Sequence, residues 1–193
     1  PARPSRIGVT FPRVLRSEWI KTRTVRSTVW TLALTVVLMV GFSALFGWGM
    51  SSSGGGGGDG PGAEVGTGSA LAVFMVTVGY AVAQFTLAVL GVLAITTEYS
   101  TGMIRSTFAA VPTRLPALAA KAIVVTLIAA VTGALALGLS WVATLGFQSK
   151  LGVSLDLGDP DTQRILLGVP LYLATIALLG FAIGTLMRRT AGA

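Results

Sequence analysis

The chain has 193 residues, of which 53% are hydrophobic and only 11% are charged, and these residues include neither cysteine nor histidine. An ordinary soluble domain is about 25% charged. The missing residue types exclude disulfide bonds, thiol chemistry and imidazole metal ligands within this sequence.

Four runs without Asp, Glu, Lys or Arg divide the chain, and they are 22, 33, 28 and 23 residues long. A helix needs about 20 apolar residues to cross a bilayer core of ~30 Å. The first run is too long for the apolar part of a cleaved signal peptide. We therefore predict an all-α, polytopic membrane protein. The expected transmembrane helices cover about 29–50, 70–97, 118–147 and 165–187.

Basic residues concentrate in three segments, 1–28, 98–121 and 188–193, which hold 12 of the 14 Lys and Arg. The loops expected at 51–69 and 148–164 hold five of the seven acidic residues. By the positive-inside rule, the basic segments are cytoplasmic and the two loops lie outside. Both ends of this chain are then cytoplasmic. This placement of the charges argues for a lipid bilayer rather than nucleic acid as the partner of the net charge of +7.

Residues 11–28 show the pattern of an amphipathic helix. Phe11, Leu15 and Trp19 fall close to one face, with basic residues elsewhere. Such a helix lies in the membrane interface. Arg23 and Arg26 mark a bend into the first span, because neither enters hydrocarbon without a large cost. The alternative is that these residues simply extend the first span. We thus divide the chain into a cytoplasmic tail with an interfacial helix, 1–28, and a transmembrane domain, 29–193.

Polar and small residues inside the expected spans predict helix contacts. Gln84 is the most polar residue at membrane depth, and Tyr80 lies one turn before it. The two residues could line a substrate path or an interface between subunits, or Gln84 could form an ordinary hydrogen bond between helices. Gly180 and Gly184 form a GxxxG pattern, which favours close helix packing. Pro170 is expected to bend the fourth span or to cap its first turn.

Motifs for nucleotide chemistry and catalysis are missing from the sequence. There is no Walker A pattern, no pair of carboxylates at membrane depth and no Ser-His-Asp set. A GxGxxG match in the glycine-rich loop at 51–69 lacks the strand and helix that such a fingerprint needs. We predict that the chain is not an enzyme and binds no cofactor or metal itself. Any energised work must draw on another chain.

A charged, proline-containing segment, 98–117, separates the second and third expected spans. Its apolar residues can lie along one side of a short helix that ends at Pro112. An exposed apolar cluster with basic neighbours is typical of a contact with a soluble partner. The alternative is a simple connecting loop. The residues assigned to this contact are Glu98, Gly102, Met103, Ile104, Arg105, Phe108, Pro112 and Arg114.

This segment resembles a known family. The order Glu98, Gly102, Pro112, Arg114 and Lys121 is similar to the inner loop of bacterial ABC transporter permeases of the type-2 exporter superfamily, especially the actinobacterial members. The stretch VLRSEWIKTRTVRSTVW resembles their amphipathic elbow helix, and GTLMRRTAGA resembles the junction after their fourth span. The family's last two spans have no counterpart in these 193 residues.

The resemblance implies a permease subunit in the bacterial inner membrane that pairs with a second permease subunit. It also implies separate cytoplasmic ATPase subunits, which bind ATP and Mg, and a coupling helix around 101–111 that docks on them. The expected function is therefore the membrane subunit of an ATP-driven exporter. The alternative is a non-transporting membrane anchor that recruits a cytoplasmic protein through the same segment.

Overall fold

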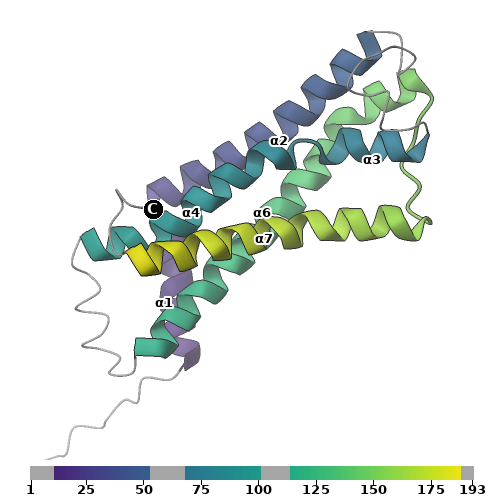
Figure 1. Ribbon diagram of the computed structural model, residues 1–193. Coiled ribbons are helices and arrows are strands. Elements are labelled where there is room, and N and C mark those ends of the chain that lie inside the picture. The colour runs from purple at the N-terminus through teal and green to yellow at the C-terminus, as the bar shows by residue number, and fades with distance from the viewer. Residues whose placement is uncertain (1–10, 53–67, 101–113, 188–193) are drawn as a thin grey trace, which may run out of the picture.

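The computed structural model describes residues 11–52, 68–100 and 114–187, and their regular structure is entirely helical. This confirms the all-α prediction for the described residues. The helices are α1 (Phe11–Thr24), α2 (Arg26–Ser52), α3 (Ser69–Thr77), α4 (Tyr80–Ser100), α6 (Arg114–Leu151) and α7 (Pro160–Met187). The long helices run between two ends of a bundle, and α1 lies across one of them (Figure 1). We call the end that α1 crosses the α1 end of the bundle. Helices α2 and α6 begin there, and α4 and α7 end there. The opposite end, where α3 lies, is the α3 end.

Four segments are long and apolar enough to cross a membrane, which confirms the predicted number of spans among the described residues. They cover Arg26–Ser52, Ser69–Thr97, Leu118–Leu151 and Pro160–Met187. Large apolar side chains also remain exposed on the outside of the bundle, including Val37, Phe85 and Leu167 at 65%, 66% and 74%. Such a surface is suited to lipid rather than to water. The chain is thus a multi-pass membrane protein by its structure as well as by its composition.

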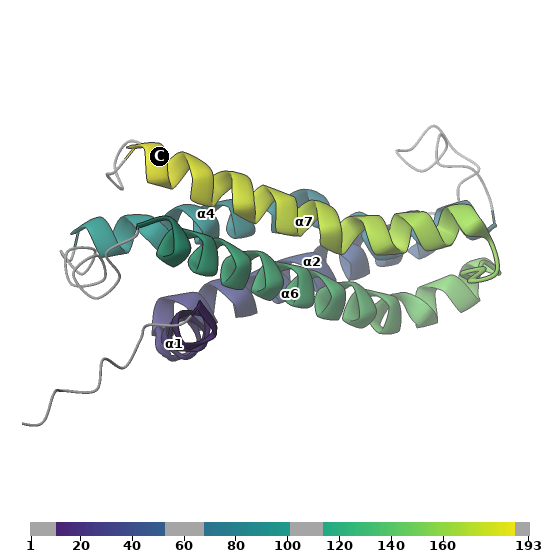
Figure 2. The same ribbon diagram turned by 90° about the horizontal axis from the view of Figure 1, so that it is seen from below.

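The first two helices are separate elements, with a break at Val25. Figure 2 looks nearly along α1, whereas α6 and α7 run across the same view. The alternative of one continuous helix through residues 11–50 is therefore wrong. The break lies between Arg23 and Arg26, where the sequence predicted it. That α1 lies in a membrane interface stays a prediction.

The second span is not the single helix that the sequence predicted for residues 70–97. It consists of α3 and α4, which are interrupted at Val78 and Gly79. The backbone of α2 comes very close here, since a Cβ added to Gly79 would lie 2.1 Å from the carbonyl oxygen of Met39. Ser43 on α2 also donates to the carbonyl of Val76, at 3.1 Å. The interruption therefore lies where one helix backbone packs directly on another.

The last helix begins at Pro160, five residues before the predicted start of the fourth span. Asp159 caps it: one carboxylate oxygen accepts the backbone N–H and the hydroxyl of Thr162, at 3.1 and 2.9 Å. Hydrogen bonds from the side chain of Thr162, and from the backbone of Thr162 and Asp161, hold the pKa of Asp159 below its usual value. Proline suits the first helical position because its missing N–H is not needed there. Pro170 lies well inside α7, so its predicted capping role is wrong.

Helices α4 and α7 also pack with their backbones in close contact. An added Cβ at Gly180 would lie 2.3 Å from the carbonyl oxygen of Ala88, and one at Gly184 would lie 2.7 Å from a methyl of Ile95. The close approach predicted from the GxxxG pattern is confirmed. Leu87 and Leu173 are fully buried beside this contact and belong to the main apolar cluster of the bundle.

Candidate functional site

A buried ion pair joins α1 to α6 at the α1 end of the bundle. The Nζ atom of Lys121 lies 2.6 Å from Oε2 of Glu18, and their side chains are only 9% and 8% exposed. Thr22, one turn along α1, donates to the carbonyl of Glu18 at 2.7 Å. Two charges withdrawn from solvent need each other, since a lone buried charge is strongly unfavourable. The pair therefore fixes the position of α1 on the first turns of α6.

The sequence predicted neither partner of this pair, although a signal for it exists. Glu18 is the single acidic residue among the first 28, and Lys121 is the last charged residue before 28 uncharged ones. A charge at the edge of a long apolar helix normally has a partner. Which partner it has depends on how α1 folds back on the bundle, and that is a tertiary property.

The residues assigned to the predicted interfacial helix lie in or beside α1. Leu15 is half-buried, Trp19 is 39% exposed, and Arg26 is exposed at the start of α2. Phe11 and Arg23 lie within α1, and only their backbone is described. Trp19 thus places an indole on the surface next to the buried Glu18, so its fluorescence can report on the contact between α1 and α6.

The residues assigned to partner contact fall mostly outside the described part of the chain. Glu98 lies in the last turn of α4 and Arg114 is the first residue of α6, with backbone alone described for each. Gly102, Met103, Ile104, Arg105, Phe108 and Pro112 lie outside the described residues. The two helix ends that flank this segment are both at the α1 end of the bundle (Figure 1).

Tyr80 and Gln84 form a second polar cluster with a residue that the sequence did not single out. Tyr172 on α7 donates its hydroxyl to Oε1 of Gln84 on α4, at 2.5 Å. The rings of Tyr80 and Tyr172 meet edge to face, with centroids 5.7 Å apart. Gln84 also donates to the carbonyl of Ala81 in its own helix. Of the roles considered for Gln84, the hydrogen bond between helices is the one present in the structure.

The Tyr172→Phe substitution is expected to weaken the contact between α4 and α7 by about 0.6–1.7 kcal/mol, the range for hydrogen bonds between membrane helices. The ring stays in place against Tyr80, so the change isolates the hydroxyl. Unfolding of the purified protein in detergent measures it. In a double-mutant cycle with Gln84→Leu, the two effects should not add. Full additivity would contradict the hydrogen bond.

Among the described residues, no group of three or more acidic side chains is placed to hold a metal ion. A comparison of the chain with protein-family models, curated proteins and solved structures found no match. The two polar contacts described above link helices: Glu18 with Lys121 joins α1 to α6, and Gln84 with Tyr172 joins α4 to α7.

Proposed function

We propose that the chain is the membrane subunit of an ATP-driven exporter of the ABC type. Residues 98–117 connect it to separate cytoplasmic ATPase subunits, which bind ATP and Mg, and a second permease subunit completes the membrane part. In this proposal the protein lies in the bacterial inner membrane, with both ends of this chain in the cytoplasm. The proposal rests on the resemblance of the inner segment and of residues 14–30, and on the way residues 98–117 join two long helices.

The observation that carries the proposal is how residues 98–117 are attached to the bundle. They join the end of α4 to the first turn of α6, and Lys121 follows one turn later. A force on this segment would reach α6 directly, and through the pair of Lys121 with Glu18 it would also reach α1. Switching proteins transmit motion in this way, through rigid packed elements that move as bodies.

The motor is assigned to another chain because this sequence has no Walker A pattern. Met103, Ile104 and Phe108, flanked by the basic Arg105 and Arg114, have the composition of a short helix that docks in an apolar groove. An ATPase subunit that changes shape on binding ATP would pull on this contact. Both ends of the segment are continuous with long helices, so the pull would be applied to α4 and α6 together.

Replacing Met103 and Ile104 together by Ala is expected to weaken the ATPase contact roughly 100-fold, because a few buried apolar side chains carry most of such an interface. The tagged chain would be purified from the membranes of its own source organism. ATP hydrolysis and a Walker A sequence in a co-purified chain are the readouts. Leu157→Ala is the matched control, since Leu157 is an exposed apolar residue between α6 and α7 at the α3 end.

Reconstituted vesicles separate the proposal from a membrane anchor. With the co-purified ATPase present, an exporter moves a solute or lipid only when ATP is supplied, and the double variant hydrolyses ATP without moving it. An anchor retains its partner but shows no ATP-dependent movement. A double variant that keeps full coupling would contradict the role assigned to Met103 and Ile104.

A further inference from the structure

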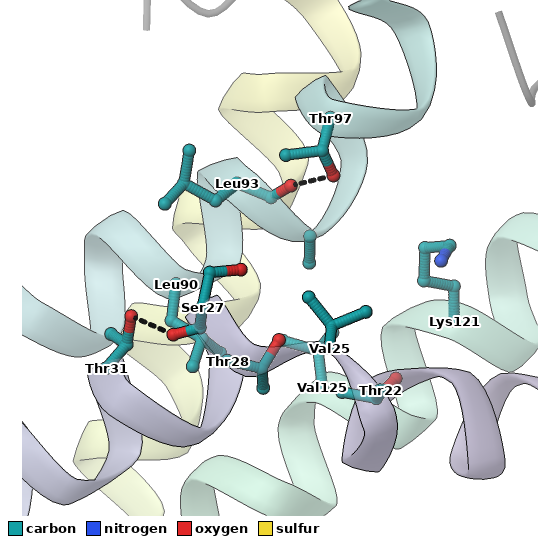
Figure 3. Close-up of a pocket in the computed structure, with 11 residues that line it drawn as sticks. Thr22, Val25, Ser27, Thr28, Thr31, Leu90, Leu93, Thr97, Lys121 and Val125 are labelled. Carbon is teal, nitrogen blue, oxygen red and sulfur yellow. Dashed lines mark hydrogen bonds between the residues drawn. The ribbon is translucent and has the colours of Figure 1, made fainter. Parts of the chain in front are cut away.

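A cavity of about 80 Å³ lies at the α1 end, where the junction of α1 and α2 meets α4 and α6 (Figure 3). One part of its wall is polar and another is apolar. Leu93, Ala94 and Val125 contribute to the apolar part. The polar part consists of Thr22, Ser27, Thr28, Thr31, Thr97 and Lys121.

The size of the cavity suits a small polar group. A cavity needs roughly 10–15 Å³ of such space to hold one water, and this cavity offers several times that. It can therefore accept a group larger than a single water, such as a phosphate. The space is also partly open to the outside, so an occupant can be part of a larger molecule that extends beyond it.

The polar wall offers hydrogen-bond donors to an anion. Three of its hydroxyl groups, those of Thr22, Thr31 and Thr97, already donate to carbonyl oxygens of their own helices and do not supply donors to a ligand. The hydroxyl groups of Ser27 and Thr28 lie in the same wall and can donate to a ligand. Lys121 adds an ammonium group to the same wall, where it is paired with the carboxylate of Glu18.

The surroundings indicate that the ligand comes from the membrane. Val25, which lines the cavity, is 42% exposed, and Trp30 on the first turns of α2 is 74% exposed. Tryptophan favours the depth of lipid headgroups. Arg16 on α1 and Arg26 on α2 are exposed and would attract anionic lipid. The cavity thus combines a mostly apolar lining, in which several hydroxyl groups and one ammonium group are set, with an exposed basic margin.

We propose that this cavity binds the phosphate headgroup of an anionic glycerophospholipid, whose acyl chains lie along the exposed apolar start of α2. The lipid would hold together the junction of α1 and α2 and the ends of α4 and α6. The site does not depend on the transport proposal, because an anchor with the same fold would bind the same lipid.

Native mass spectrometry of the purified chain in detergent tests the site, with dioleoylphosphatidylglycerol as the probe. Dioleoylglycerol has the same acyl chains and no phosphate, and it should bind much more weakly. The Ser27→Ala/Thr28→Val double variant should bind phosphatidylglycerol roughly 100-fold more weakly, as expected for two lost hydrogen bonds to a charged group. Ala94→Leu fills the cavity and should abolish the bound lipid.

Two control variants change the same residue types on exposed surfaces. Thr175→Val on α7 and Ala70→Leu on α3 should retain the lipid as the unmodified chain does, because neither residue lines the cavity or lies on the start of α2. The site is wrong if Ser27→Ala/Thr28→Val and Ala94→Leu bind phosphatidylglycerol normally, or if dioleoylglycerol binds equally well. Inorganic phosphate that binds as tightly as the lipid would overturn the assignment to a membrane ligand.

Discussion

Replacing Glu18 by Gln is expected to destabilise the folded protein by about 3–5 kcal/mol, because the ammonium of Lys121 is left buried without its counter-charge. The geometry of the pair supports this large effect: Nζ of Lys121 and Oε2 of Glu18 are 2.6 Å apart, and both side chains are less than one-tenth exposed. Lys121→Met should have an effect of similar size for the converse reason. Unfolding of the detergent-solubilised protein, followed by tryptophan fluorescence, gives the free energies.

A cycle of variants separates the ion pair from general damage to α1. The double variant Glu18→Gln/Lys121→Met removes both charges and should cost clearly less than the sum of the single changes, since no unpaired charge remains. Arg164→Gln is the matched control. This substitution breaks the ion pair of Arg164 with Asp161. The two side chains are 80% and 78% exposed, and such a pair contributes at most about 1 kcal/mol to the free energy of unfolding. Equal effects of Glu18→Gln and Arg164→Gln would contradict a buried pair.

The same cycle connects stability with the proposed function. If Glu18 and Lys121 transmit movement from residues 98–117 to α1, the double variant should be more stable than either single variant and still couple ATP hydrolysis poorly. A variant with the two charges exchanged, Glu18→Lys/Lys121→Glu, keeps the attraction and should recover both properties in part. Stability and coupling that always change together would favour a purely structural role for the pair.

The number and positions of the spans could be predicted from the sequence because the signal is strong and local. Four uncharged runs of 22 to 33 residues leave few alternatives to membrane helices. The break near Arg23 and Arg26 was also predictable, since each charge favours the interface over the hydrocarbon. Helix ends were less accurate: α7 begins at the Asp159–Pro160 cap, and this cap lies outside the apolar run that defined the span.

The features that the sequence did not predict depend on contacts between distant residues. The interruption between α3 and α4 lies where Gly79 meets the backbone of Met39, 40 residues earlier in the chain. Tyr172 donates a hydrogen bond to Gln84, 88 residues earlier in the chain, and the sequence separation of Lys121 and Glu18 is similar. Residue type alone does not specify such partners. The contact assigned to Met103, Ile104 and Phe108 stays a prediction, because these residues lie outside the described ranges.

The Gly91→Ala substitution is expected to separate α4 from α7 and to cost about 3 kcal/mol or more, at the upper end of the range for overpacked sites. A Cβ at this position would lie 2.0 Å from the carbonyl oxygen of Ala177 and 2.9 Å from the backbone nitrogen of Phe181. Both atoms belong to the backbone of α7, so no side chain can rotate to make room. The helices must move apart, and the contacts of the neighbouring Gly180 are lost as well.

Two other glycines provide the control for this prediction. Gly41 on α2 and Gly138 on α6 have no atom within 4 Å of an added Cβ. Alanine at either position should be neutral or stabilise the protein by up to about 1 kcal/mol, because alanine is the better helix former. Detergent-unfolding measurements on the three variants compare them directly. If Gly91→Ala is as stable as Gly138→Ala, the direct backbone contact between α4 and α7 is absent, and the two helices do not move as one body.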